Sequence, residues 1–332
     1  MSRLRFALIL PIAALLLAPA CSSSDDADDA GLRVVATTPL LAEFAGRVAG
    51  EDAHVSALIP LGVDLHSWQP STTVARDIAQ ADVVIVNGYG LEEALLGIVS
   101  ANARSDASLV TAADGLETLE GGHADEDHAD EDHADEDHAD EDHADEDHAD
   151  EGNADEDHAE GGGDPHLWLS VPNAIGYVEN IRDALVAADA AHASGYAERA
   201  AEFIAELEAL DAEVRSSLAA IPEGRRTIVA FHDAYQYLAA EYGMEVVATV
   251  APSNPNQGTS AQAIAEIVEL VRALGVGAVF KEPQFSAQSL DLIAQESGAR
   301  VLELRSTLSE DTPTYAEVMR ANVAALVDGL GS

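Results

Sequence analysis

Short apolar segments alternate with helical patterns in two successive stretches of this chain, and this alternation limits the fold more than any other feature. The strands expected in the first stretch are Arg33–Thr37, His54–Ile59, Asp82–Val86 and Ser108–Ala112. Those expected in the second are Thr227–Phe231, Glu245–Val250, Ala278–Phe280 and Val301–Leu304. Strands that are apolar on both faces and separated by helices are typical of a parallel sheet buried between helices. The sequence therefore predicts an α/β fold with two pseudo-symmetric lobes, each built on a four-stranded parallel sheet flanked by helices.

A long helix is expected to join the two lobes. The segment from Ser194 to Ala220 carries a single apolar stripe, with spacings of three and four residues, at Leu207, Leu210, Val214 and Leu218. A helix of this length would span roughly 40 Å at about 1.5 Å per residue. We expect an N-terminal lobe over 32–171, a helical segment over 172–222 that contains the linking helix, and a C-terminal lobe over 223–332. The other expected helices are 39–49, 73–80, 91–101, 173–188, 233–242, 260–274, 286–297 and 314–330.

A histidine- and acid-rich insertion at 121–163 interrupts the first lobe. From Ala124 the pentad Ala-Asp-Glu-Asp-His recurs, and a period of five fits neither a helix nor a strand. Because alanine is the only apolar residue of the repeat, we expect a disordered loop. Imidazole binds borderline divalent metals, so the histidines are interpreted as a metal collector; the alternative is an acidic spacer with incidental histidines. These histidines are His123, His128, His133, His138, His143, His148 and His158.

The first 20 residues resemble a signal peptide. Arg3 and Arg5 precede an apolar run that is too short to span a membrane and ends at Ala20, directly before Cys21. Cys21 is the only cysteine, and its position resembles a bacterial lipobox whose cysteine is lipidated after cleavage. We therefore expect an exported, membrane-anchored lipoprotein with a polar tether over 21–31. An ordinary secretory signal with an unmodified cysteine is the alternative.

The charge of the chain argues against nucleic acid as a partner. The formal net charge is -45, and 21 of the 61 acidic residues lie between Asp125 and Glu160. The remainder is still moderately acidic, whereas nucleic-acid binding relies on basic surfaces. A metal cation is compatible with this charge.

Three histidines lie at positions suited to a metal site. His66 and His232 follow expected strands, and His166 lies where the insertion meets the apolar segment Leu167-Trp168-Leu169. Ligands of α/β sheets bind beyond the carboxyl ends of the strands, so these side chains could converge between the lobes. Asp64, Asp164 and Asp233 are candidate acceptors that would orient the three rings. His54 and His192 are interpreted as exposed structural residues.

Several motifs together resemble the solute-binding proteins of zinc and manganese ABC importers, the ZnuA/TroA-like family. They are Gly62-Val63-Asp64-Leu65-His66, Asn87-Gly88-Tyr89-Gly90-Leu91-Glu92, Asp164-Pro165-His166-Leu167-Trp168-Leu169, Phe231-His232-Asp233-Ala234-Tyr235 and Glu282-Pro283-Gln284-Phe285-Ser286. The resemblance covers the chain from about Leu32 to Leu330. It implies a metal held between two lobes and delivered to an ABC permease, and it places the family's ligands at His66, His166 and His232.

The family's fourth ligand, an aspartate, has no match here because the corresponding residue is Arg305. An arginine keeps its charge and cannot bind a metal. The candidates for the fourth ligand are an acid such as Glu303 or Asp311, the carboxylate of Glu282, and a water molecule. We favour three histidines plus water. Imidazole-rich sites favour Zn²⁺, whereas Mn²⁺ sites favour carboxylate oxygens, so Zn²⁺ is the expected cargo.

The sequence thus predicts a monomeric, extracytoplasmic zinc-binding protein of an ABC importer, with the histidine-rich loop as collector or sensor. A surface lipoprotein that buffers metal or supports adhesion, and a manganese importer protein, are the alternatives. Three histidines plus water also occur in catalytic zinc sites, but no His-Glu-x-x-His pattern or nucleophile elbow is present. An enzyme is therefore not expected.

Overall fold

The computed structural model describes residues 31–66, 68–119, 163–251, 259–286 and 288–331 of the 332-residue chain. The expected signal peptide, the tether that begins at Cys21 and the histidine repeat from His123 to His158 lie outside these residues. In the described part of the chain, no helix combines the length and apolar character that crossing a membrane requires.

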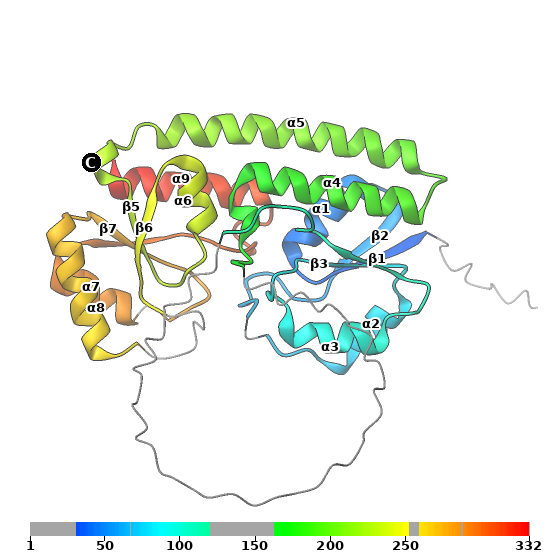
Figure 1. Ribbon diagram of the computed structural model, residues 1–332, viewed down its shortest axis with the longest axis horizontal. Helices are drawn as coiled ribbons and strands as arrows, with labels where there is room; N and C mark the ends of the chain where they lie inside the picture. The colour runs from blue at the N-terminus through cyan, green and yellow to red at the C-terminus, as the bar shows by residue number, and fades with distance from the viewer. Residues whose placement is uncertain (1–30, 67, 120–162, 252–258, 287, 332) are drawn as a thin grey trace, which may run out of the picture. The chain divides into compact units, whose positions relative to one another are not determined.

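The first sheet consists of four parallel strands in the order β2-β1-β3-β4. They are β1 (Leu32–Ala36), β2 (Ala53–Ala57), β3 (Val83–Val86) and β4 (Ser108–Thr111). Alternate side chains of β1 point to opposite faces, so that Val34 packs with helix α1 (Pro39–Ala49) and Val35 packs with α2 (Thr72–Gln80) and α3 (Glu93–Asn102). A core therefore lies on each face of this sheet, as expected for a parallel sheet buried between helices (Figure 1).

The second sheet repeats the topology of the first, with parallel strands in the order β6-β5-β7-β8. They are β5 (Thr227–Ala230), β6 (Glu245–Thr249), β7 (Ala278–Lys281) and β8 (Arg300–Glu303). Its helices are α6 (Gln236–Tyr242), α7 (Ala261–Leu274), α8 (Gln288–Ser297) and α9 (Tyr315–Leu330). Helices α6 and α9 contact one face of the sheet and α8, against which α7 packs, contacts the other (Figure 1). The predicted fold of two four-stranded parallel sheets flanked by helices is confirmed.

A helical segment connects the two sheets. It comprises the 3-10 turn η1 (Leu167–Leu169), α4 (Val171–Ala188), the 26-residue α5 (Ala193–Leu218) and the 3-10 turn η2 (Glu223–Arg225). The predicted stripe on α5 is buried and continues to Phe203, Ala200 and Tyr196. Helix α5 contacts α1 and α4 of the first lobe and α9 of the second, so it runs along both lobes (Figure 1).

Several ion pairs join α5 to the lobes, among them Arg199 with Asp52 and Arg215 with Glu241, and two others are exposed on both sides. Arg47 of α1 contacts Glu206 at 2.7 Å, and Arg320 of α9 contacts Glu213 at 2.8 Å. Both pairs are exposed, and exposed pairs add only about 0.2–1 kcal/mol, so the buried stripe is the main source of cohesion. The described residues from Leu32 onward belong to one compact unit.

Candidate metal centre

His66, His166 and His232 converge on one point. One ring nitrogen of each lies within 4.8 Å of the others. The ring centroids of the three pairs are 5.2–5.6 Å apart. His66 comes from the loop after β2 in the first lobe, His232 follows β5 in the second, and His166 immediately precedes η1. The predicted convergence of the three side chains is therefore present in the structure.

His166 is buried and held by Asp164. Oδ1 of Asp164 accepts a hydrogen bond from the backbone N–H of His166 at 2.9 Å and lies 2.7 Å from Nδ1 of the ring. Because an ionised carboxylate only accepts hydrogen bonds, the Nδ1 proton of the ring is directed toward Asp164, and the lone pair of Nε2 is left for another partner. Nε2 lies 3.3 Å from Nε2 of His66. The candidate role of Asp164 as a ring acceptor matches this geometry.

His232 is also buried, and its ring is held by Glu282 rather than by Asp233. Nδ1 of His232 hydrogen-bonds Oε1 of Glu282, whereas Asp233 accepts from Nε2 of Gln236 at 2.8 Å. Burial lowers the pKa of His232 and the Glu282 carboxylate raises it by more, so the pKa lies above its ordinary value of 6.5. Nε2 of His232 is buried and has no hydrogen-bond partner among the described residues. A buried, unpartnered ring nitrogen needs an external partner such as a metal ion.

The carboxylate of Glu282 is buried, and both of its oxygens have hydrogen-bond partners. It is 1% exposed, and its second oxygen accepts hydrogen bonds from the hydroxyl of Ser306 and from Nε2 of Gln284, the latter at 2.8 Å. The pairing of Ala230 in β5 with Phe280 in β7 explains its position. His232 and Glu282 each lie two residues beyond that pair, so they lie level with each other at the carboxyl edge of the sheet. Aligning the two neighbouring strands by their register would have predicted Glu282 as the partner of His232 from the sequence.

His66 differs from the other two ligand candidates because it is partly exposed. Asp64 accepts a hydrogen bond from its backbone N–H at 3.0 Å. Burial lowers the pKa of His66 to about 4, and the neighbouring His166 and His232 add to this effect. The ring is therefore neutral at physiological pH, which is the form that binds metals.

No fourth histidine, cysteine, aspartate or glutamate from the described residues joins this group. The backbone of Arg305 hydrogen-bonds Asn322, with Arg305 N donating to Oδ1 at 2.7 Å, and its guanidinium contacts Glu303 at 3.3 Å. Glu303 is also paired with Lys281 at 3.4 Å. Glu282 lies on the Nδ1 side of His232, whereas the free nitrogen of that ring is Nε2. Because these carboxylates are held by other partners, we favour an external ligand such as water for the fourth position.

The segment that carries His166 is held from both lobes. The side-chain amide of Asn87, directly after β3, donates to the carbonyl of Pro165 at 2.9 Å. From the second lobe, the carbonyl of Ser306 accepts from Nε1 of Trp168 at 2.8 Å, and the hydroxyl of Tyr315 donates to the carbonyl of Trp168 at 2.7 Å. The Trp168 ring centroid lies 5.4 Å from that of His166. Trp168 therefore packs beside the site, while His54 and His192 lie outside the group.

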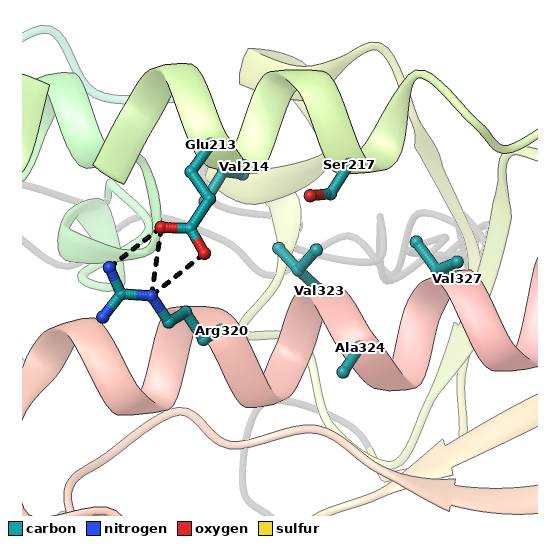
Figure 2. Close-up of a pocket in the computed structure, with 7 residues that line it drawn as sticks. All are labelled: Glu213, Val214, Ser217, Arg320, Val323, Ala324 and Val327. Carbon is teal, nitrogen blue, oxygen red and sulfur yellow. Dashed lines mark hydrogen bonds and ion pairs between the residues drawn. The ribbon is translucent and has the colours of Figure 1, made fainter. Parts of the chain in front are cut away.

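A separate cavity lies between α5 and α9, and it is not the metal centre. It encloses about 310 Å³ and is lined by Glu213, Val214, Ser217, Arg320, Val323, Ala324 and Val327. Figure 2 shows the Glu213–Arg320 ion pair at one end, with valine side chains from both helices along its length. Valine and alanine side chains make up most of its lining, and it has no histidine or cysteine that could bind a metal.

The arrangement of the three histidines suits a divalent cation. Tetrahedral zinc with Zn–N bonds of about 2.0–2.1 Å requires nitrogens about 3.3–3.4 Å apart. The separation of 3.3 Å between Nε2 of His66 and Nε2 of His166 meets that requirement. Two carboxylates that hold the opposite ring nitrogens are the outer partners seen around metal-bound imidazoles. Two α/β lobes with such a donor set between them define a metal-binding protein of the solute-binding class.

Comparison with known proteins agrees with this class. Residues 34–329 match the family described as zinc-uptake complex component A, periplasmic. The chain is 30% identical to the high-affinity zinc uptake system protein ZnuA of Bacillus subtilis over 329 residues, covering 96% of this chain and 95% of the relative. It is 28% identical to the manganese-binding lipoprotein MntA of Halalkalibacterium halodurans over 338 residues, covering 99% of each.

A solved structure shows the same fold. The periplasmic zinc-binding protein TroA of Treponema pallidum superposes with a TM-score of 0.74 at 20% identity, covering 91% of this chain and 100% of that protein. The chain belongs to the ZnuA family of periplasmic metal-uptake components. It is therefore a metal-binding component of an ABC metal importer, and its relatives differ in the metal for which they are named.

Proposed function

We propose that this protein captures Zn²⁺ outside the cytoplasm with His66, His166 and His232 and delivers it to the permease of an ABC importer. The observation that carries the proposal is the convergence of three imidazole nitrogens, one of which, Nε2 of His232, is buried without a partner. Such a donor set is costly to bury unless a cation binds to it.

The donor set supports Zn²⁺ over Mn²⁺. Nitrogen donors suit zinc, whereas manganese is typically bound by carboxylate, carbonyl and water oxygens. The two buried carboxylates nearest the group, Asp164 and Glu282, hold ring nitrogens rather than joining the ligand atoms. The fourth position is then filled by water, because Arg305 replaces the aspartate that the family resemblance implies.

The remaining parts of the proposal concern segments outside the described residues. The seven histidines of the insertion would bind Zn²⁺ weakly and exchangeably and pass it to the three-histidine site; a sensor that impedes docking at high zinc is the alternative role. Cys21 would carry the lipid that holds the monomeric protein on the extracytoplasmic face of the membrane. A deletion of 121–162 should slow zinc uptake when zinc is scarce, and unchanged uptake would contradict the collector role.

The metal preference can be tested on a shortened chain. The variant begins at Gly31 and lacks 121–162, which removes the competing histidines. The backbone N–H of Asp164 donates to the carbonyl of Leu119 at 3.3 Å, so the described residues that flank the deleted segment already lie side by side. Calorimetric titration with Zn²⁺, and competition by Mn²⁺ and Fe²⁺, should show one tight zinc site that His166→Ala removes.

Two results would change the proposal. A site that prefers Mn²⁺ would point to a carboxylate ligand and to the function of a manganese importer protein. The absence of any tight site in the shortened chain, with binding retained by the full chain, would leave the histidine-rich insertion as the functional element and favour a buffering lipoprotein.

A further inference from the structure

The hydroxyl of Tyr237 lies where the two chain segments that flank the insertion meet. It accepts a hydrogen bond from the backbone N–H of Leu119 at 3.0 Å and donates one to the carbonyl of Asp164 at 2.8 Å. Burial raises the pKa of Tyr237 to about 12, so the hydroxyl keeps the proton that it donates. Tyr237 belongs to α6 in the second lobe, whereas Leu119 follows β4 in the first. One hydroxyl therefore ties the base of the insertion to the opposite lobe.

A short path leads from this hydroxyl to the metal centre. The carboxylate of Asp164 accepts from the backbone N–H of His166 and holds the Nδ1 side of its ring. Tyr237, Asp164 and His166 are all buried, at 4%, 8% and 4% exposure. The hydrogen bond from Tyr237 to the carbonyl of Asp164 restricts the orientation of the Asp164 backbone. That orientation determines where the Asp164 carboxylate contacts the His166 ring.

Other side chains hydrogen-bond the backbone of the segment that carries His166, but at residues other than Asp164. Asn87 binds the carbonyl of Pro165, and Tyr315 binds that of Trp168. The hydroxyl of Tyr242, also on α6, accepts from the backbone N–H of Val171 at 3.3 Å and donates to Asp211 at 3.0 Å. Tyr242 therefore offers a matched control, because it is a buried tyrosine of the same helix that binds the segment at the start of α4 and has no contact with Asp164.

We infer that Tyr237 is a positioning residue for metal binding, which acts through Asp164 to aim the ring of His166 from the second lobe. The inference rests on the proposed metal-binding function of the three histidines. It assigns to α6 a part in the metal site, although none of its side chains is a ligand. Asp164 then connects the two places, because its carbonyl binds Tyr237 beside the insertion and its carboxylate binds the ring of His166 at the metal centre.

Full-length protein is tested with Co²⁺ as the probe. Paramagnetic Co²⁺ quenches indole fluorescence at short range, and the chain has two tryptophans, of which Trp168 lies against His166. The part of the fluorescence quenching that is lost in His166→Ala measures Co²⁺ binding at the three-histidine site. Tyr237→Phe should weaken this binding about tenfold, the lower end of the effect seen for outer partners of metal ligands. It should also change the visible spectrum of bound Co²⁺, which reports ligand geometry, whereas Tyr242→Phe should leave affinity within about twofold and the spectrum unchanged.

A double-mutant cycle separates a path through Asp164 from a general loss of stability. Asp164→Asn should weaken Co²⁺ binding by about 10- to 100-fold, and the double variant with Tyr237→Phe should be no weaker than Asp164→Asn alone. Additive effects, or a Tyr237→Phe variant that behaves like Tyr242→Phe, would overturn the inference while leaving the site intact. A wild-type protein with no quenching that depends on His166 would instead overturn the proposed function.

Discussion

His232 and His66 come to the metal centre from different lobes, and their surroundings differ sharply. His232 is 3% exposed and its ring is held by Glu282, which is itself bound by Ser306 and Gln284. His66 is partly exposed, and Asp64 accepts a hydrogen bond from its backbone N–H. The topology of the two lobes is the same, yet β2 is an edge strand and β5 lies inside its sheet. The comparison shows a prearranged half of the site in the second lobe and a more accessible ligand from the first.

Removal of each histidine in turn gives the largest expected effect and tests this difference. His232→Ala deletes a ligand and leaves Glu282 buried without its imidazole, so affinity for Zn²⁺ should fall by more than about 100-fold, beyond the effect of losing an outer partner. His66→Ala should also weaken binding, by a smaller factor, because it removes a more exposed ligand. Titration of the shortened chain measures both, and equal losses would contradict the asymmetry.

The outer carboxylates should differ in the same direction. Glu282→Gln removes the charge that holds Nδ1 of His232 and should weaken Zn²⁺ binding by about 10- to 100-fold. Asp64→Asn keeps an oxygen that can accept from the backbone N–H of His66, so it should cost about fivefold or less, the equivalent of one ordinary hydrogen bond. The competition titration provides the measurement, with circular dichroism to show that both variants are folded. A loss in Asp64→Asn as large as that in Glu282→Gln would contradict this order.

The pH dependence of binding should separate the two histidines. A metal displaces a proton from any ring that is protonated, so affinity falls as pH falls through the pKa of that ring. The pKa of His232 is raised above 6.5, so Zn²⁺ affinity should begin to fall as pH falls toward that value. The pKa of His66 is lowered to about 4, so this ring should compete with protons only in much stronger acid. Calorimetry in buffers of different ionisation enthalpy counts the released protons; a release near neutral pH that falls more in His66→Ala than in His232→Ala would contradict this order.

The contact between the lobes at Glu43 gives the smallest expected effect. Glu43 of α1 accepts from the backbone N–H of Tyr315, at the start of α9, at 2.7 Å. Burial raises the pKa of this carboxyl from 4.5 to about 7. Between these values the folded protein binds more protons than the unfolded chain, so stability should fall as pH rises from about 4.5 to about 7. Glu43→Gln should lessen this slope in urea unfolding experiments, and an unchanged slope would assign it to other groups.

Much of the fold was predictable because each buried parallel strand is apolar on both faces. Strands such as β3 and β5 follow directly from that pattern, and the linking helix follows from the stripe at Leu207–Leu218. Helix ends were less precise. Helix α6 begins at Gln236 rather than Asp233, because the chain after β5 first forms the turn that places His232.

The three ligand candidates were predictable because ligands gather at the carboxyl ends of parallel strands. Their partners were only partly so. Asp164 is two residues from His166, but Asp233, which lies beside His232 in the sequence, binds Gln236 instead. Glu282 and Tyr237 reach the site through strand register and across the lobes, and sequence proximity carries no record of such contacts.

The most direct test is the position of zinc in a crystal of the shortened chain, located by anomalous scattering at the zinc absorption edge. The account predicts one ion bound at about 2.0–2.1 Å by a ring nitrogen each of His66, His166 and His232, with water at the remaining position. Glu282 should still hold Nδ1 of His232. An ion bound elsewhere, or one coordinated by the carboxylate of Glu282 with His232 turned away, would contradict the central claim.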